Sequence, residues 1–401
     1  MAVSAARHSG DGCAQRHQYA RRMQKSWRRP LLPVFALVLG MALAACAVDG
    51  TPTRGPITLK TGKYGGEQTP ALGDADSPVS WAKLRAVRLA DHMVFPSAID
   101  PKLDDGKLPT QPLATVTNTQ IVIPDTADLP AMKHFEYGFT VTAGNADDND
   151  YGFNQAVYVF SDDKAATAAV DELSGAMLKP SRYSKFAKAP VPGLPAGAVG
   201  IHDGGKYGET VAAFTTQGSR LIYTWAKSPD RGWSERVAAT GQEQQIALLK
   251  DVGADSDDRR IDPDGLLTGT LRSDDGNPLH KAVYGRRAAA LFYGDQEAAL
   301  RALTAAGIDR FAWNGSQAYR AASERQAAGW VDFLAENFED ETTRKASSPQ
   351  DLGSARCLKS GRRAACFITV GRYVGEVYDS TLEDAQAQIS AQYTFLKKLR
   401  D

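Results

Sequence analysis

The sequence has few of the residues that build metal and redox centres. Its 401 residues include only four cysteines and six histidines. Zinc sites use several closely placed ligands, often two histidines at i and i+4 of one helix. The histidines beyond the leader described below instead stand singly: His92, His134, His202 and His280. The sequence therefore predicts no metal site and no cofactor.

An excess of one charge is also missing. The chain has 47 basic and 47 acidic residues, and removal of residues 1–45, which hold seven bases and one acid, leaves 40 and 46. Nucleic-acid-binding domains are usually basic, and adhesion to anionic lipid needs clusters of Lys or Arg. A net charge of −6 for residues 46–401 argues against nucleic acid as a partner and against electrostatic attachment to a membrane.

The apolar run near the N-terminus is too short to be a membrane span. It extends over 13 residues from Leu31 to Leu43, whereas a spanning helix needs about 20. The run follows a basic stretch and ends at the small pair Ala44 and Ala45. This combination predicts a signal peptide over residues 1–45. The residues before Met23 are unlike a signal sequence, so Met23 is a candidate start.

The residues Leu43-Ala44-Ala45-Cys46 form a lipobox. Small residues fit the signal peptidase, and the thiol of Cys46 can carry a diacylglyceryl thioether. The alternative is an ordinary secretory signal followed by a chance cysteine. Acyl chains contribute about 0.8 kcal/mol for each buried methylene. We therefore expect a protein held by lipidated Cys46 at the extracytoplasmic face of the cell membrane.

Cys357 and Cys366 are the two cysteines that remain beyond Cys46. They flank a polar, Gly-containing segment that suits the turn of a hairpin, and an exported protein meets oxidising conditions. We predict a Cys357–Cys366 disulfide that stabilises the fold by roughly 2–3 kcal/mol in the chain-entropy account. The alternatives are two free thiols or a metal pair, for which no further ligands stand nearby.

The first half of the chain alternates strand and helix signals after a Gly- and Pro-rich tether at residues 46–68. The predicted first domain covers residues 69–250 and an acidic linker covers 251–265. Within the domain we expect the following elements: a helix capped by Ser77 or Ser80, a strand at 156–160, a helix at 164–173 capped by Ser161, a hairpin at 210–215 and 220–225, and a helix at 236–250.

The second half, residues 266–401, repeats this order with different residues. We predict a strand at 288–293, a helix at 296–306, a strand at 317–322, a helix from Ser323 to Leu334, a hairpin at 367–370 and 373–377, and a helix at 382–399. The alternative is coincidence between two generic orders. The expected fold class is α+β, with two related domains that each have an antiparallel sheet covered on one face by helices.

These features resemble a family of actinobacterial cell-envelope lipoproteins that is defined only as a domain of unknown function. The resemblance spans nearly the whole mature chain and rests on the lipobox and on four segments: 88–96, 288–306, 371–377 and 391–393. It implies a fold and a location in the cell envelope, and it implies no activity. The order of elements is also faintly similar to extracellular sensor domains of actinobacterial Ser/Thr kinases, which is too generic to indicate a ligand.

Four motif-like segments lack the sequence context that their chemistry requires. Residues 200–206 have phosphate-loop spacing, but Tyr207 replaces the Ser or Thr that holds magnesium, and a strand rather than a helix follows. Ser234 approaches a nucleophile elbow, but Arg236 replaces the closing glycine. The acidic runs at 145–150 and 255–258 lack the Gly and Glu of a calcium loop. No catalytic residue is assigned.

We therefore expect a non-catalytic protein that binds an envelope lipid, glycan or protein, using loops or a groove between its two domains. One alternative is a hydrolase with a nonstandard site around His202, Asp203 and Ser234, which requires those side chains to lie within hydrogen-bond reach. Another is an accessory subunit of an envelope complex.

Overall fold

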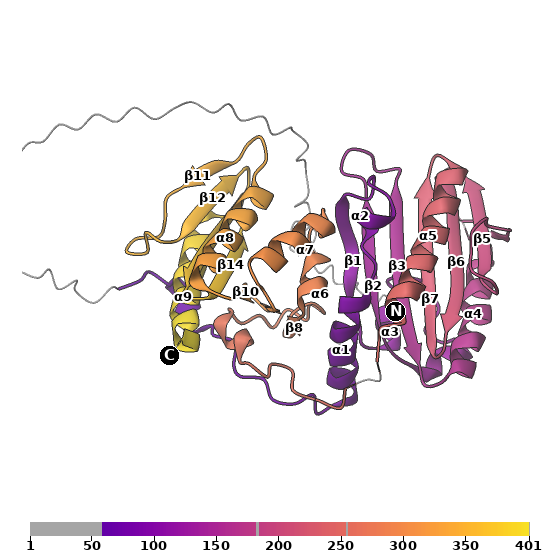
Figure 1. Ribbon diagram of the computed structural model, residues 1–401, viewed down its shortest axis with the longest axis horizontal. Helices are drawn as coiled ribbons and strands as arrows, with labels where there is room; N and C mark the ends of the chain where they lie inside the picture. Colours follow the sequence, from indigo (N-terminus) through magenta and orange to yellow (C-terminus); the bar gives the residue numbers. More distant parts are fainter. Residues whose placement is uncertain (1–57, 182–183, 254–255, 401) are drawn as a thin grey trace, which may run out of the picture.

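Two antiparallel sheets of seven strands lie side by side in the computed structural model (Figure 1). The structure describes residues 58–181, 184–253 and 256–400. The predicted signal peptide, Cys46 and the first part of the predicted tether lie outside these residues. None of the described helices is both long and apolar enough to cross a bilayer.

The first sheet has the strand order β1-β2-β3-β7-β6-β5-β4. Its strands are β1 (Asp105–Leu113), β2 (Phe135–Gly144), β3 (Gly152–Phe160), β4 (Ala187–Lys188), β5 (Val199–Gly205), β6 (Gly208–Gln217) and β7 (Arg220–Ser228). The associated helices are α1 (Pro78–Leu89), α2 (Pro96–Ile99), α3 (Val116–Thr119), α4 (Asp163–Met177) and α5 (Arg231–Leu249), with 3-10 turns η2 (Ala90–His92) and η3 (Pro130–His134).

The helix starts follow from local capping. Ser77 and Ser80 form a reciprocal capping box on α1, in which each hydroxyl accepts the main-chain amide of the other residue. The cap of α4 is Asp162, one residue later than the predicted Ser161, because the Asp162 carboxylate accepts the Ala165 amide at 2.8 Å. A carboxylate at this position also suits the positive end of the helix dipole.

The second sheet has the order β11-β12-β13-β14-β10-β9-β8. Its strands are β8 (Ala282–Tyr284), β9 (Arg310–Trp313), β10 (Gln317–Arg320), β11 (Arg344–Ala346), β12 (Arg356–Ser360), β13 (Arg363–Val370) and β14 (Tyr373–Asp379). Its helices are α6 (Arg286–Ala290), α7 (Gln296–Ala305), α8 (Glu324–Phe338) and α9 (Leu382–Arg400), with 3-10 turns η1 (Gly62–Gly66) and η4 (Leu266–Gly269).

The two sheets have one topology. Read from β8, the second order is β8-β9-β10-β14-β13-β12-β11, which is the first order with seven added to every number. Helices α8 and α9 follow β10 and β14 as α4 and α5 follow β3 and β7. The predicted α+β fold of two related domains, each built on an antiparallel sheet, is confirmed.

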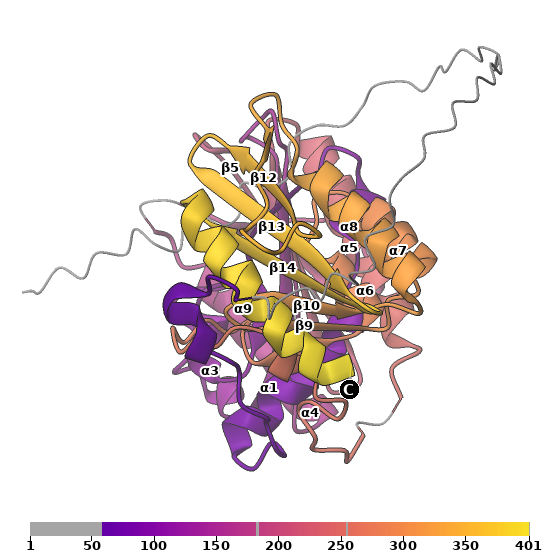
Figure 2. The same cartoon turned by 90° about the vertical axis from the view of Figure 1, so that its left-hand side faces the viewer.

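Each sheet carries helices on both faces, where the sequence predicts helices on one. In the first domain, Tyr158 packs with α4, whereas Phe153, on the opposite face of the same strand, packs with α5. In the second domain, Phe367 packs with α8 and its neighbour Cys366 packs with α9, which crosses the sheet in Figure 2. Strands buried on both faces are apolar in nearly every position, and this weakens the alternation that marks a single covered face.

The predicted strand at 288–293 is wrong, because residues 286–290 form helix α6. Asp91, in η2 of the first domain, accepts the Ala288 amide at 2.8 Å and so caps α6 from the other domain. Gly285 is required here, since a Cβ at this position would lie 2.0 Å from the Asp91 carboxylate. The contact that fixes this helix is therefore 197 residues away in the sequence.

One hydrophobic cluster runs through both domains. It joins Val87 of α1 and Phe139 of β2 to Leu303 of α7 and Trp330 of α8. Residues 58–68, predicted as the end of a tether, pack on the second domain, where Tyr64 donates to Asp384 of α9. The N-terminal segment and the shared core both join the two halves, so we expect them to behave as one cooperative unit.

The predicted disulfide is present. Cys357 of β12 and Cys366 of β13 are direct cross-strand partners, with Cα atoms 4.1 Å apart. This separation is typical of a non-hydrogen-bonded antiparallel pair, the position at which side chains approach most closely.

Candidate functional site

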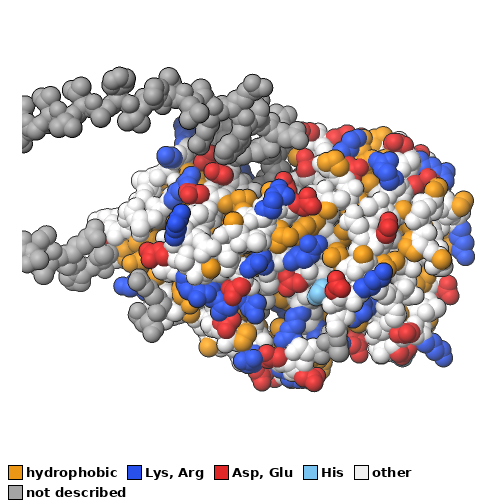
Figure 3. Space-filling view, viewed as in Figure 1, with side chains coloured by type: hydrophobic (Ala, Val, Ile, Leu, Met, Phe, Trp, Pro, Cys, Tyr) orange, Lys and Arg blue, Asp and Glu red, His pale blue; other side chains and the backbone are white. Residues whose placement is uncertain are grey.

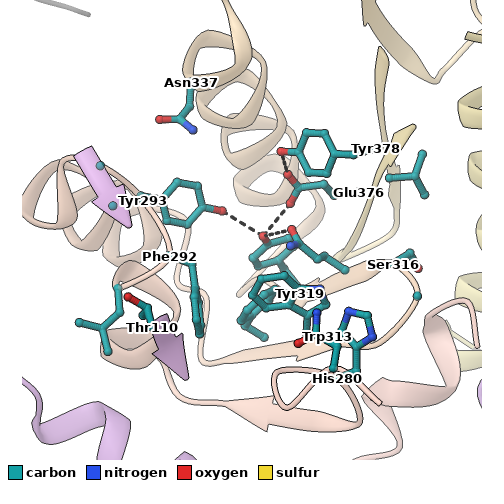
Figure 4. A pocket seen from close by; sticks show the side chains of 18 of the residues that line it. Thr110, His280, Phe292, Tyr293, Trp313, Ser316, Tyr319, Asn337, Glu376 and Tyr378 are labelled. Carbon is teal, nitrogen blue, oxygen red and sulfur yellow. Dashed lines mark hydrogen bonds between the residues drawn. The ribbon is translucent and has the colours of Figure 1, made fainter. Parts of the chain in front are cut away.

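The described residues enclose a cavity of about 120 Å³ at the junction of the two domains. The first domain contributes Gly106, Lys107 and Thr110 of β1, and the second contributes residues around Phe292 and residues of β9, β10 and β14. Figure 4 shows the side chains of these elements converging from several directions. Ligand sites often form at such domain junctions.

Glu376 forms the polar centre of the cavity wall. It lies in the middle of β14, between Gly375 and Val377, and is 1% exposed. The Tyr319 hydroxyl lies 2.6 Å from one carboxyl oxygen of Glu376, and the Tyr378 hydroxyl donates to the other. Both oxygens are therefore held by phenols in one orientation (Figure 4).

The Tyr319 hydroxyl connects this carboxyl to a second tyrosine. It lies 3.0 Å from the Tyr293 hydroxyl and 3.1 Å from the side-chain carbonyl of Gln317. A phenol has one proton to donate. When Tyr319 donates to Glu376, Tyr293 supplies the proton for its own bond to Tyr319. The result is a directed chain from Tyr293 through Tyr319 to the carboxyl.

Burial raises the pKa of Glu376 to about 7, and the bonds from Tyr319 and Tyr378 oppose this shift. Loss of hydration disfavours the charged carboxylate, whereas hydrogen bonds donated to it favour the charge. Among the described residues, no basic side chain forms an ion pair with Glu376. Lys107, which also lines the cavity, pairs with Asp105. The Glu376 carboxyl thus changes charge near neutral pH without a protein cation beside it.

Aromatic rings form much of the remaining wall. Phe292 meets Trp313 edge-to-face at 5.0 Å between centroids, and Phe311 stacks on Tyr319 at 4.8 Å. Rings packed at these distances hold one another in place. His280 lines the same cavity and is 3% exposed, with Nδ1 3.0 Å from Asp275.

The sequence-derived hydrolase residues do not form the expected relay. The Ser234 hydroxyl is fully buried and donates to the main-chain carbonyl of Glu209, while His202 pairs with the Glu209 carboxylate at 2.6 Å. The Asp203 carboxylate accepts the Lys185 amide. Within the described part of the chain, no hydrogen bond joins Ser234 to His202 or Asp203. His202 and Asp203 lie on β5, next to the edge strand β4, whereas Ser234 lies on α5.

Two further motif-like segments have structural explanations, while the second acidic run, 255–258, begins outside the described residues. Residues 199–205 are strand β5, which turns directly into β6, so no helix N-terminus faces them. In the first acidic run, the Asn145 side chain accepts the amides of Asp147 and Asp148, which makes a turn. Across the described ranges, no group of three or more His, Cys, Asp or Glu side chains is placed to hold a metal ion.

Glu376, Tyr319 and Tyr293 were not identified from the sequence as site residues. Glu376 lies within the 371–377 segment that carries the family resemblance, where it is a lone acid between apolar residues of a predicted strand. A charged residue in a buried strand is unusual, and this was the available signal. No feature of the sequence marks Tyr293 as a site residue, since the segment around it is predicted to be a strand.

The outer surface gives less indication of a binding site than the cavity does. On the face shown in Figure 3, basic and acidic side chains are interspersed, with scattered hydrophobic side chains between them. Neither sign gathers into a broad patch among the coloured residues of this face, so long-range attraction of a charged partner has no focus here.

Two models of one protein family together match most of the chain. They are the N-terminal and C-terminal parts of the domain of unknown function DUF7373, which match residues 72–264 and 265–398. The chain belongs to this family. Glu376 falls in the C-terminal part, whereas Gly106, Lys107 and Thr110, which line the same cavity, fall in the N-terminal part.

A solved structure, the extracellular domain of PknH from Mycobacterium tuberculosis, is similar at 14% sequence identity. The similarity covers 40% of this chain and 96% of that chain, with a TM-score of 0.29. A likeness this distant adds nothing about fold or function. No curated protein matches the sequence.

Proposed function

We propose that this DUF7373 protein is a lipid-anchored, extracytoplasmic binding protein that holds a small ligand in the cavity between its domains. The single observation that carries the proposal is the cavity itself, with a buried and precisely held carboxyl at its centre. A carboxyl kept at 1% exposure without a basic partner is unfavourable for stability alone. The destabilising carboxyl of Glu376 is therefore best explained by a role in binding a ligand.

The surroundings of the carboxyl favour binding. Tyr319 and Tyr378 fix both oxygens, and the stacked rings behind them fix Tyr319, so the acceptor is preorganised and loses little freedom when a ligand arrives. Thr110 and Lys107 reach the cavity from the other domain. A ligand seated here would touch both halves and stabilise their relative arrangement.

The proposed anchor is the thioether of Cys46, supported by the lipobox and the short apolar leader. Replacement by serine, Cys46→Ser, removes the acylation site and should move the protein from the membrane pellet to the soluble fraction of the same cells. A matched substitution of a buried cysteine pair, Cys357→Ala with Cys366→Ala, should leave the protein in the pellet. Membrane retention of Cys46→Ser would overturn the anchor without affecting the cavity.

The binding proposal is tested by analysing what the full-length protein retains. Protein extracted from its own membranes in mild detergent is measured by native mass spectrometry, and small molecules released on denaturation are identified by their masses. We expect a bound species in wild type and its loss in Gly106→Leu. Gly106 lines the cavity, and a Cβ there would lie 3.9 Å from the Tyr293 carbonyl, which is an ordinary contact. We therefore expect the leucine side chain to be tolerated and to take up part of the cavity.

Gly353→Leu is the matched control, because Gly353 is exposed and a Cβ there meets nothing within 4 Å. It should retain the bound species. A wild-type protein that is uniformly empty, and that gains no thermal stability from any fraction of an envelope extract, would contradict the proposal. Equal retention by Gly106→Leu and wild type would place the ligand elsewhere.

A further inference from the structure

We infer that the interdomain cavity takes a small organic cation, whose ammonium group faces Glu376 and whose hydrocarbon part packs against the aromatic wall. The inference rests on the proposed binding function and names the chemical class of its ligand. It combines three features of the cavity: an acidic group without a basic partner, an aromatic lining, and a limited volume.

The charge of the cavity is unbalanced when Glu376 is ionised. Lys107, which lines the cavity from the first domain, is paired with Asp105. Tyr319 and Tyr378 donate hydrogen bonds to the carboxylate but bring no positive charge. An ammonium group on the ligand supplies the missing charge and gains a short, charge-assisted hydrogen bond.

The walls suit the rest of such a ligand. Ammonium groups are attracted to the faces of Trp, Tyr and Phe within about 6 Å of the ring centre. Phe292, Trp313 and Tyr319 line the same cavity as Glu376, so the cavity offers ring surface to a cation. The same rings provide apolar contacts for the methyl or methylene groups of the ligand.

Other ligand classes fit less well. An anion would meet the carboxylate of Glu376 directly, and a polyol would leave the charge uncompensated while facing mostly carbon. The cavity volume of about 120 Å³ limits the seated group to a few heavy atoms, although a longer chain can extend out of the cavity, which is partly open to solvent.

Three probes of equal chain length test the inference on unmodified full-length protein. They are n-butylammonium, n-butanol and butyrate, titrated at pH 8, where most of the Glu376 carboxyl is ionised because its pKa is about 7. Binding is followed by calorimetry and by the fluorescence of Trp313, with Trp313→Phe identifying the fluorescence signal of that residue. We expect butylammonium to bind at least tenfold more tightly than butanol, and butyrate not to bind.

The variant Glu376→Gln keeps the shape of the side chain and removes its charge. It should weaken butylammonium binding at least tenfold and leave butanol unchanged. Glu336→Gln is the charge-matched control, because Glu336 is an exposed acid on α8, next to the cavity residue Asn337. Its effect on butylammonium should stay within twofold.

The outcomes separate this inference from the proposal on which it rests. If butanol binds as tightly as butylammonium and Gly106→Leu abolishes both, the cavity binds ligands but not as a cation site. If butylammonium binds Glu376→Gln as well as wild type, Glu376 is not the counterion. If no probe binds and membrane-extracted protein is empty, both the inference and the binding function fail.

Discussion

The two domains share one topology but differ in the residues at equivalent positions of their sheets. Each central hairpin closes on a cross-strand pair, Gln217 with Arg220 in the first sheet and Val370 with Tyr373 in the second. Counting three residues onward from Arg220 and from Tyr373 shows that Tyr223 and Glu376 are equivalent. Their partners on β6 and β13 are both phenylalanines: Phe214 and Phe367.

The neighbouring strand extends the equivalence. Tyr158 of β3 and Tyr319 of β10 each lie opposite the residue that follows the hairpin pair. The first domain therefore holds two tyrosines where the second holds a tyrosine and a glutamate. All four side chains lie on the faces covered by α4 and α8.

The covering helices explain the different outcomes. Helix α4 presents small side chains, among them Ala166 and Ala169, so it lies close to the sheet and seals Tyr158 and Tyr223 in an apolar core. Burial raises the pKa of both tyrosines. Helix α8 presents Trp330, which packs edge-on to Tyr319 at 5.3 Å, and Asn337, which lines the cavity.

The comparison suggests how a duplicated fold gains a site. One copy keeps a closed core that stabilises the molecule, while the other accepts a buried acid and the space around it. Three substitutions test this division.

The largest effect is expected from Tyr223→Glu, which brings the acid of the second domain into the closed core of the first. Tyr158 stands there in the place of Tyr319, but Trp225 occupies the position of Tyr378, so only one phenol could donate to the new carboxylate. We therefore expect a loss of roughly 4 kcal/mol or more in the free energy of unfolding at pH 8. Urea denaturation measures this. Tyr223→Phe is the control and should lose less than about 1 kcal/mol, because it keeps the aromatic ring and removes only the hydroxyl. A loss below about 1 kcal/mol for Tyr223→Glu would show that the first core is not closed.

Glu376→Gln should raise the free energy of unfolding, whereas Tyr223→Glu lowers it, and the gain should depend on pH. The pKa of Glu376 is raised from 4.5 to about 7 in the folded protein. Between these two values the folded state binds a proton that the unfolded state has lost, so stability falls as pH rises through this range. Above pH 7 the carboxylate destabilises the fold by roughly 3 kcal/mol relative to acid pH.

The variant lacks this titration. It should match wild type near pH 4.5 and exceed it by up to about 3 kcal/mol at pH 8. Other titratable groups around the cavity, namely Tyr293, Tyr319, Tyr378, Lys107 and His280, are present in both proteins and cancel in the difference. Urea denaturation at several pH values gives the comparison. A difference that does not change with pH would exclude a raised Glu376 pKa.

The smallest of the three effects is expected from the disulfide, which also distinguishes the domains. By the same register, Cys357 and Cys366 correspond to Gly200 and Ala213 of the first sheet. Replacing both cysteines with alanine should cost about 2–3 kcal/mol, since the bridge closes a short loop. Denaturation of wild type with and without reductant provides the control. A cost near zero would mean that strand pairing alone holds β12 to β13.

Much of the repeat was visible in the sequence. The hairpins at 210–225 and 367–377, the helices after them, the Ser77 cap and the paired cysteines all leave local signals in turn residues, periodicity or spacing. These features depend on residues within about ten positions of one another, so they can be inferred without knowing the rest of the fold. That helices cover both faces of each sheet is harder to see in the sequence. Strands buried on both faces are apolar at nearly every position, so they lack the alternation of polar and apolar residues that marks a single covered face.

Other features depended on distant contacts. Residues 286–290 are helical because Asp91 caps them from the first domain, and residues 58–68 are ordered because α9 offers a surface. No local pattern contains this information. Glu376 was visible as an unusual acid in a strand, but its partners Tyr319 and Tyr293 could be found only once the sheets were assembled.

The sequence by itself determined the duplicated order of strands and helices and the disulfide, because each is encoded by neighbours along the chain. The export signal and the lipobox stay predictions from the sequence, since they lie outside the described residues. Only the tertiary structure decided where the cavity lies and which side chains line it. The physical reason is that a buried carboxyl acquires its raised pKa and its directed hydrogen bonds from groups brought together by folding. The cavity belongs to the junction of two domains, and neither half contains it alone.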